Sequence, residues 1–399
     1  MRIRCRTRDL NRALRLAATV VQKMRLVTQL WHAKIEATGQ ALLRTFNVDA
    51  YVTIRFPAEV EESGFAFFPV KEALDIVRYL QDTVTVSGDY SGIVLKDING
   101  STRVESSMTE SGDLPQAPEL REENTLVVPF RPFLTALRRV KHAVARRQVN
   151  RPGLERIGLF FYEGSSDTAI LDVVASDGHR LAWQTVAIEA CYEKKSDVRI
   201  VMPVELLRIF EKIPIEPAPR QVYAALKHGK AGNYEHEWLI LQADSGDFAT
   251  SVAALLLDDA YPDWRNVLPE RIKPVAYVHV KDILQPLKRI PENVPVEMAT
   301  DSTGKIRLKS SSGSVEITAL SVDKAPLAVT VDSRYLREAI EAVGEKDVVV
   351  LSVPADCEKQ PKLLLCTTDD GYMALIATIV QDDEAAPATT GQSDGETAV

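Results

Sequence analysis

Six amphipathic segments recur along the chain at similar intervals, and this repeat constrains the fold more than any other feature. In each segment apolar residues return at three- and four-residue spacing, which is typical of a helix with one buried face. The segments span residues 8–22, 70–81, 130–147, 203–213, 280–290 and 332–345. One helix per roughly 65 residues predicts a chain built from repeated units.

Local signals refine the predicted helices. Pro132 and Pro203 stand near the start of the third and fourth segments, where a missing N–H costs nothing. Pro286 should kink or shorten the fifth helix. Asp332 or Ser333 is the expected N-cap of the sixth.

The stretches between the helices read as short strands rich in Val, Ile, Thr and Leu, separated by turn signals such as Asn99-Gly100 and Asp370-Gly371. Strand-rich units with one helix each indicate an α+β fold, in which helices cover one face of antiparallel sheets. Polar, Pro-bearing stretches at 114–124 and 262–274 are candidate linkers. We therefore expect three domains of two helices each, at residues 1–122, 123–269 and 270–381, followed by a disordered acidic tail at 382–399.

Composition excludes several classes of protein. The 399 residues carry a net charge of −8, so a uniformly basic nucleic-acid coat is excluded. No stretch approaches the roughly 18 consecutive apolar residues of a membrane span, and the basic N-terminus leads into an amphipathic pattern rather than a secretory signal. The four cysteines are far apart and form no CxxC motif, which indicates reduced thiols in the cytosol and no metal site.

Charge is distributed unevenly between the helices and the rest of the chain. The six segments hold 18 basic and 10 acidic residues, although the whole chain is acidic. The segment at 130–147 has six basic residues and no acidic one. Either the charges simply populate solvated helix faces, or the helices share one surface that meets phosphate.

No motif indicates catalysis strongly. The sequence Asp177-Gly178-His179-Arg180 follows an apolar strand and predicts first a hairpin turn; a ligand-binding corner and nucleophilic catalysis are the alternatives. His236 lies between Glu235 and Glu237, but alternate strand residues face opposite ways, which disfavours a shared metal. Phosphate-loop, dinucleotide-binding and zinc-protease patterns do not occur, so we expect neither an active site nor a cofactor.

Two motifs together resemble one known family. The sequences ASDGHRLA at 175–182 and YPDWRNVLP at 261–269 are similar to signatures of the bacterial DNA polymerase III beta sliding clamp, in the same order and at similar spacing. The resemblance covers about residues 1–380, faintly in the last third. It implies three similar domains in a head-to-tail homodimeric ring, with the helices lining a hole that encircles duplex DNA.

The resemblance also implies functional residues. DNA contact is expected from a basic loop after the first helix and from the third helix and its end: Lys23, Arg25, Arg138, Arg139, Lys141, Arg146, Arg147, Gln148 and Arg151. A cleft for linear peptides is expected at Leu154, Ser176, Gly178, His179, Arg180, Leu181, Pro262, Asn266, Val267, Ala374, Ile376, Ala377 and Thr378. Arg103 and Val104 are the expected dimer contacts.

The chain departs from the family pattern in two places. Asn266 stands where many members have Arg, and residues 376–379 replace the usual C-terminal Met-Pro-Met-Arg. We therefore expect a stiffer peptide pocket walled by Leu154, Leu181, Val267 and Ile376.

The function implied is a non-catalytic, cytoplasmic, nucleoid-associated processivity factor. Its implied partners are duplex DNA, the polymerase III catalytic subunit, a clamp loader and other proteins with clamp-binding motifs. The alternative is a specialised clamp-fold platform for a repair polymerase or regulator, rarely loaded on DNA. A hydrolase using His179 is a more remote alternative.

Overall fold

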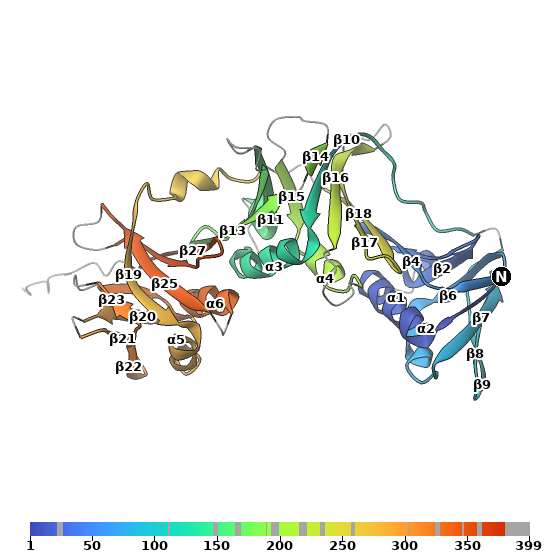
Figure 1. The fold of residues 1–399 in the computed structure, drawn as a ribbon, viewed down its shortest axis with the longest axis horizontal. Helices are drawn as coiled ribbons and strands as arrows, with labels where there is room; N and C mark the ends of the chain where they lie inside the picture. The colour runs from blue at the N-terminus through green and yellow to red at the C-terminus, as the bar shows by residue number, and fades with distance from the viewer. Residues whose placement is uncertain are drawn as a thin grey trace, which may run out of the picture. The chain divides into compact units, whose positions relative to one another are not determined.

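A computed structural model describes most of the chain, and Figure 1 shows its elements. The described residues are 1–21, 27–110, 112–146, 151–163, 169–188, 190–192, 199–214, 222–231, 236–256, 260–301, 303–323, 328–344, 347–356 and 361–379. The chain falls into two compact units: unit 1 comprises Met1–Leu268 with Thr367–Ala374, and unit 2 comprises Pro269–Cys366 with the chain from Leu375 onward. The predicted tail at 382–399 lies outside the described residues, and the three-domain division stays a prediction.

Unit 1 contains three groups of antiparallel strands. One sheet runs in the order β5 (Glu59–Glu62), β1 (Arg2–Arg6), β7 (Thr83–Asp89), β8 (Gly92–Asp97) and β9 (Gly100–Glu105). A nine-stranded sheet runs β14 (Ala190–Tyr192), β10 (Leu120–Pro129), β16 (Tyr223–Ala231), β17 (Glu237–Asp244), β18 (Ala249–Leu255), β4 (Ala50–Phe56), β3 (Ala41–Phe46), β2 (His32–Ala37) and β6 (Gly64–Pro69). The third group is β15 (Arg199–Pro203), β11 (Arg156–Glu163), β12 (Ala169–Ser176) and β13 (Arg180–Ile188).

The nine-stranded sheet joins the first two predicted domains. Strands β18 and β4 pair antiparallel over six residues, with Val252 opposite Val52, and both side chains are buried. Residues about 200 positions apart in the chain therefore share one ladder. The predicted boundary at residue 122 falls inside β10, a strand of the same sheet.

Unit 2 has two groups of antiparallel strands. One runs β26 (Leu363–Thr367), β25 (Val348–Pro354), β19 (Ile272–His279) and β23 (Ser321–Val322), and the other runs β22 (Gly313–Thr318), β21 (Lys305–Ser310), β20 (Pro295–Thr300) and β24 (Ala328–Asp332). The last strand, β27 (Tyr372–Ala377), begins in unit 1, and its residues from Leu375 onward belong to unit 2.

Most of the six described helices begin directly at the end of a strand. They are α1 (Thr7–Val20), α2 (Val70–Val77), α3 (Phe130–Val140), α4 (Leu206–Phe210), α5 (Val280–Leu287) and α6 (Ser333–Val343). The residue before α1, α2, α3, α5 and α6 has extended backbone, which suits an N-cap because that position is not yet helical. The described part of the chain also contains four shorter 3-10 helices, η1 (Thr28–Trp31), η2 (Lys141–Ala143), η3 (Pro152–Glu155) and η4 (Trp264–Val267).

All six predicted helices are present, with differences at their ends. Asp332 is the N-cap of α6, since its Oδ1 accepts hydrogen bonds from the backbone N–H of Arg334 and Tyr335. Pro286 lies in the last turn of α5, which ends one residue later. The prediction for Pro203 was wrong: it is the last residue of β15, where it pairs with Arg156, and α4 starts three residues further on.

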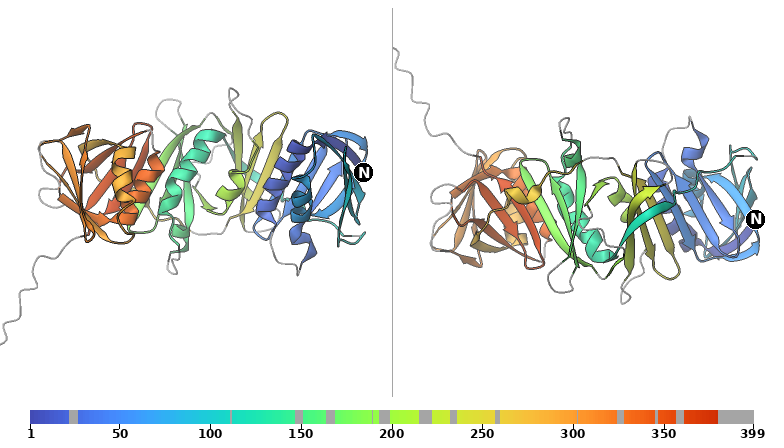
Figure 2. Two further views of the ribbon diagram at one scale, coloured as in Figure 1. Left: turned by 90° about the horizontal axis from the view of Figure 1, so that it is seen from below. Right: turned by 90° about the horizontal axis from the view of Figure 1, so that it is seen from above.

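Paired helices cover the sheets with their apolar faces. Figure 1 shows α1 beside α2 in unit 1, and the left view of Figure 2 shows α5 beside α6 in unit 2. Leu10, Leu14 and Ala17 of α1 are buried, and α1 contacts β3 and β4 of the nine-stranded sheet. The observed architecture is therefore α+β with antiparallel sheets, as the periodicity predicts.

Candidate nucleic-acid and peptide interfaces

Four of the predicted DNA-contacting residues, Lys23, Arg25, Arg147 and Gln148, lie outside the described residues. Another four, Arg138, Lys141, Arg146 and Arg151, are exposed. Arg138 Nε donates to Glu211 Oε1 at 2.9 Å, so its charge is partly compensated. Lys141, Arg146 and Arg151 make no ion pair within the described part of the chain, which leaves them free to meet an anion.

Arg139 has a different role from the one predicted. Its side chain is only 11% exposed, and its Nη1 donates to Gln184 Oε1 at 2.9 Å and to Asp370 Oδ2 at 2.5 Å. Burial opposes ionisation of Asp370, but hydrogen bonds from Thr368 and Arg139 outweigh it and lower the pKa of that carboxyl group. A guanidinium held in this way fastens the 367–374 segment to α3 within unit 1, and we remove it from the proposed DNA surface.

His142 lies in the same cluster. Its Nε2 is 3.0 Å from the hydroxyl oxygen of Tyr372, and its Nδ1 has no hydrogen-bond partner in the described part of the chain. Burial, together with the nearby charge of Arg180, lowers the pKa of His142 to about 3. The imidazole is therefore neutral at physiological pH and lies half-buried beside Tyr372.

The corner at residues 176–181 is a hydrogen-bonded turn. Asp177 Oδ1 accepts from the backbone N–H of His179 and Arg180, and its Oδ2 accepts from Arg180 Nε at 3.0 Å. Gly178 has φ +90°, a conformation that disfavours side chains with a Cβ. Ser176 Oγ donates to the carbonyl of Arg180, not to a histidine, so the hairpin prediction is confirmed and the turn contains no nucleophilic relay.

The predicted peptide-cleft residues differ in exposure. Leu154, Leu181, Ala374 and Ile376 are buried, as is the side chain of Arg180, whereas Val267 is 54% exposed. His179, Gly178, Asn266 and Ala377 are also exposed, and Ser176, Pro262 and Thr378 are half-buried. Ile376, Ala377 and Thr378 belong to unit 2 and the remaining members to unit 1, so the cleft as a whole stays a prediction.

The second family-like motif forms a structural anchor. Trp264, on η4, is buried, with its ring centroid 5.3 Å from Trp183 and 6.1 Å from Phe160. Arg265 Nη2 donates to Asp172 Oδ2 at 2.8 Å, and the guanidinium lies 3.8 Å from the ring centroid of Tyr162. Although Arg265 and Thr185 both donate to it, burial dominates and raises the pKa of Asp172. Sequence reasoning missed this structural role.

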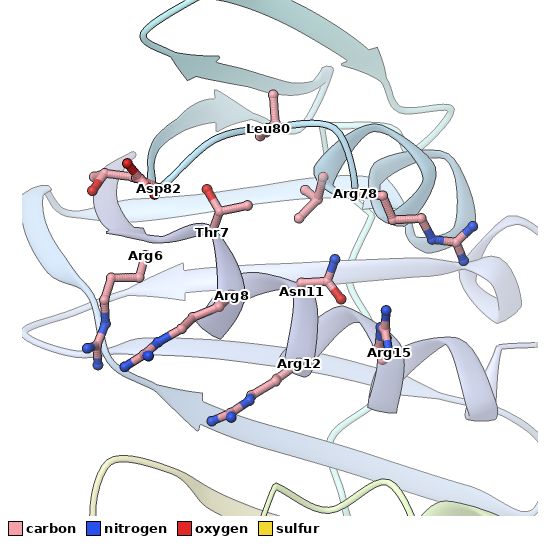
Figure 3. Close-up of a pocket in the computed structure, with 11 residues that line it drawn as sticks. Arg6, Thr7, Arg8, Asn11, Arg12, Arg15, Arg78, Leu80 and Asp82 are labelled. Atoms are coloured by element: carbon pink, nitrogen blue, oxygen red, sulfur yellow. The ribbon is translucent and has the colours of Figure 1, made fainter.

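Sequence reasoning also missed a basic groove between α1 and α2, of about 670 Å³, which we name the arginine groove. Its lining comprises Arg6, Thr7, Arg8, Asn11, Arg12, Arg15, Val77, Arg78, Leu80, Asp82 and Thr83. In Figure 3, Arg8 and Arg12 extend from α1 in the same direction. The spacing of the α1 arginines along one face was the signal available in the sequence.

The predicted dimer contacts lie on β9, at one edge of the five-stranded sheet. Val104 is 2% exposed and packs inside its own protomer. Arg103 is exposed, and its Nη2 donates to Ser91 Oγ at 3.1 Å. The groups that β9 can offer to a partner are therefore its backbone edge and its exposed side chains, not the valine.

The described residues offer neither a metal site nor a membrane-spanning helix. No group of three or more His, Cys, Asp or Glu side chains among them could hold a metal ion. Of the helices described, none is long and apolar enough to cross a membrane.

Comparison with known proteins finds relatives in sequence and in fold. No family model matches the chain. The beta sliding clamp of Synechococcus elongatus is 23% identical over 371 residues, covering 88% of this chain and 92% of the relative, and that of Rickettsia bellii is 21% identical over 319 residues, covering 79% and 77%. The DNA polymerase beta subunit of Streptococcus pyogenes aligns with a TM-score of 0.77 at 16% identity, over 96% of this chain and all of its own.

A further solved structure contains a bound peptide. The Helicobacter pylori beta clamp bound to a DNA ligase peptide aligns with a TM-score of 0.74 at 17% identity, over 95% of this chain and 100% of that one. The chain therefore has the fold of the DNA sliding clamps. Over most of its length it is similar in sequence to bacterial beta sliding clamps, at a low identity that makes it divergent from them.

Proposed function

We propose that two copies of this chain form a ring around duplex DNA and tether the replicative polymerase, without catalysing a reaction themselves. A closed ring is linked topologically to the DNA and cannot simply dissociate, so its contacts with DNA can be weak. A tethered polymerase rebinds its primer end at high effective concentration. Phosphate contacts are blind to sequence, which suits a protein that slides.

Two features together support the proposal. The chain has the sliding-clamp fold over nearly its whole length, and its helical elements carry cations that have no ion-pair partner in the described part of the chain. Lys141 and Arg146 follow α3, and Arg12 and Arg15 lie on α1, all exposed and without a described ion-pair partner. The chain as a whole is acidic at −8, so these cations are a local surface rather than a general property. Lys23, Arg25, Arg147, Gln148 and Arg151 belong to the same proposed surface.

The proposed dimer joins sheet edges. In unit 1 the strand β9 ends the five-stranded sheet, and in unit 2 the strand β22 ends the four-stranded sheet. An unpaired strand edge presents backbone donors and acceptors that another chain can complete. We propose that β9 of one protomer, at Arg103 and Val104, pairs with the β22 edge of the other, so that the two interfaces are equivalent.

The proposed partners are a polymerase catalytic subunit, a clamp loader and other proteins that carry clamp-binding peptides. A peptide complex is known for the Helicobacter pylori beta clamp. In this chain Val267 is the exposed apolar member of the proposed cleft, and Leu154, Leu181 and Ile376 lie buried. A peptide therefore needs these side chains to rearrange before it can anchor on them, which favours weaker or more selective binding. We place the protein in the cytoplasm, on the nucleoid.

A second candidate function is a platform for a repair polymerase or regulator that is rarely loaded on DNA. Two observations favour it: Arg139 is committed to Asp370, and Arg138 to Glu211, so the third helix offers fewer free cations than its sequence suggests.

One experiment separates these functions. The full chain is incubated with its clamp loader, ATP and a nicked circular plasmid, and the complex is isolated by gel filtration. The sliding clamp predicts co-elution that is lost when the plasmid is linearised, because a ring slides off a free end. Failure to co-elute under conditions where the loader hydrolyses ATP would favour the platform.

A further inference from the structure

The face of the nine-stranded sheet opposite α1 carries the side chains that alternate with the buried ones on β3 and β4. Arg44 and Phe46 of β3, with Tyr51 and Thr53 of β4, are half-buried on this face. The ring centroids of Phe46 and Tyr51 are 5.7 Å apart, and Tyr51 lies 5.8 Å from Trp238 of β17. An aromatic row therefore crosses from the strands of the first predicted domain to those of the second.

A segment of this chain, residues 112–118, lies on the same face, and we name it the strap. Leu114 is buried in one cluster with Phe67 of β6, and Asp113 pairs with Lys34 Nζ of β2 at 2.9 Å. The strap also has two prolines at PxxP spacing, which favours an extended backbone. The face thus already holds an extended peptide through one apolar anchor with an acidic residue beside it.

A pocket of about 160 Å³ remains between the strap and the sheet, within unit 1. Its walls are Arg44 and Thr45 of β3, residues 51–53 of β4 and residues 114–117 of the strap. The side chains of Tyr51, Thr53 and Gln116 make no hydrogen bond in the part of the chain that the structure describes. Polar groups on both walls are therefore available to the backbone of a second extended segment.

Arg44 places a cation with unused donors at this pocket. Its Nη1 contacts Glu36 at 3.2 Å, and the same carboxylate pairs with Lys34 Nζ at 2.8 Å, so one carboxylate serves two cations. The Nε and Nη2 groups of Arg44 have no partner among the described residues. A guanidinium can pair with a carboxylate through two parallel N–H groups, so Arg44 can accept a further acidic side chain.

We propose that this pocket docks an extended, proline-containing peptide of a partner protein. An apolar side chain of the peptide enters between Tyr51 and the strap, and a neighbouring Asp or Glu pairs with Arg44. The strap is the model for this occupant: its acidic residue pairs with Lys34, and Arg44 stands directly opposite Lys34 on the next strand. Aromatic-lined grooves bind such segments well because a preformed extended backbone loses little entropy. The pocket shares no residue with the proposed peptide cleft, and it goes beyond the proposed function, which does not require it.

The test titrates the full chain with a fluorescent peptide that has the strap's own sequence, Gly-Asp-Leu-Pro-Gln-Ala-Pro, and follows anisotropy. Binding should be saturable, and Tyr51→Ala or Arg44→Gln should each weaken it about 10-fold, the effect expected from losing a buried anchor or a charged hydrogen bond. The controls Tyr79→Ala and Arg307→Gln change an exposed tyrosine and an exposed arginine elsewhere and should leave the affinity unchanged. The same peptide with lysine in place of its aspartate should bind the wild type about 10-fold more weakly, a comparison that needs no variant to fold.

Other outcomes would overturn the proposal. Absence of saturable binding, or equal affinity for the two peptides, would refute the docking pocket. Loss of binding in Lys34→Gln but not in Arg44→Gln would show that the peptide displaces the strap instead, and loss only in Val267→Ser would place it in the proposed cleft. Plasmid retention is measured in parallel: retention without peptide binding refutes the pocket alone, whereas peptide binding that needs Arg44 and Tyr51, without retention, supports the pocket and refutes the ring.

Discussion

Arg265 and Asp172 form an ion pair across 93 residues of sequence, with Arg265 Nη2 donating to a carboxylate that is only 5% exposed. The pair fastens η4, which contains Asn266 and Val267, to strand β12. A buried carboxylate that loses its cation keeps the cost of desolvation without the compensating bond. The position of the exposed Val267 therefore depends on this contact.

Replacing Arg265 by Ala should destabilise the protein by about 1–3 kcal/mol, because Asp172 is left with Thr185 as its described side-chain donor. The measurement is the midpoint of thermal unfolding. Arg271→Ala, at an exposed arginine of unit 2, is the control and should leave the midpoint unchanged. Adding Asp172→Asn to Arg265→Ala should cost less than the sum of the single changes, and strict additivity would contradict the pairing.

Substitutions of Arg139 and of the cations that follow α3 should have different effects on DNA binding. Lys141→Gln and Arg146→Gln should each reduce the log–log salt slope by about 0.9, because each removes a phosphate contact. Arg139→Gln should leave the slope unchanged and lower the melting temperature, because it breaks the contact with Asp370. A slope change for Arg139→Gln equal to that for Arg146→Gln would place the Arg139 guanidinium at phosphate instead.

His142 should make the protein sensitive to mild acid. Its pKa of about 3 in the folded chain lies below the ordinary value of 6.5, so the unfolded chain binds more protons between these values. Stability is therefore retained above pH 6.5 and lost as the pH falls, by about 2 kcal/mol at pH 5.

The substitution His142→Gln should reduce the loss of unfolding free energy between pH 7 and pH 5 by that amount. His236→Gln, at an exposed histidine, is the matched control and should leave the loss as it is in the wild type. Identical pH profiles for wild type and His142→Gln would show that the imidazole has the same pKa in the folded and the unfolded chain, which would contradict the prediction.

Cys5 and Cys366 should be unreactive in the folded protein. Burial raises the pKa of each thiol to about 12, so almost no thiolate is present at pH 8. Iodoacetamide followed by peptide mass mapping should leave both residues unmodified in buffer and modify both in denaturant. Rapid labelling of either residue in buffer would mean that its strand opens readily.

The dimer should have twice the chain mass of 44.2 kDa in light scattering at micromolar concentration and moderate salt. Arg103→Glu, on the proposed β9 edge, should shift the mass towards the monomer, because it reverses an exposed charge at that edge. A monomeric wild type would contradict the ring.

The sequence predicts those features that local chemistry determines. Apolar spacing identifies all six helices, Asp332 is a cap because its carboxylate reaches the next backbone N–H groups, and Asp177-Gly178 forms a turn for a similar reason. The pairing of β18 with β4 is different, since alternation reveals a strand but not its neighbour. Arg139 likewise has the spacing of a surface residue, and its partner Asp370 is 231 positions away.

The candidate site also depends on which distant segments pack together, and a sequence pattern does not reveal this. The family resemblance directs attention to the third helix and the loops, where positions match a known pattern. The arginine groove needs the side-by-side packing of α1 and α2, which lie about 60 residues apart and which no motif connects.

The continuous ladder between β18 and β4 bears on how a closed ring admits DNA. Six paired residues with a buried Val52–Val252 centre make this junction stiff, because bending it breaks several hydrogen bonds at once. Within the proposed function, a loader that opens the ring must therefore deform another part of it. The first two-thirds of each protomer should move as one rigid body.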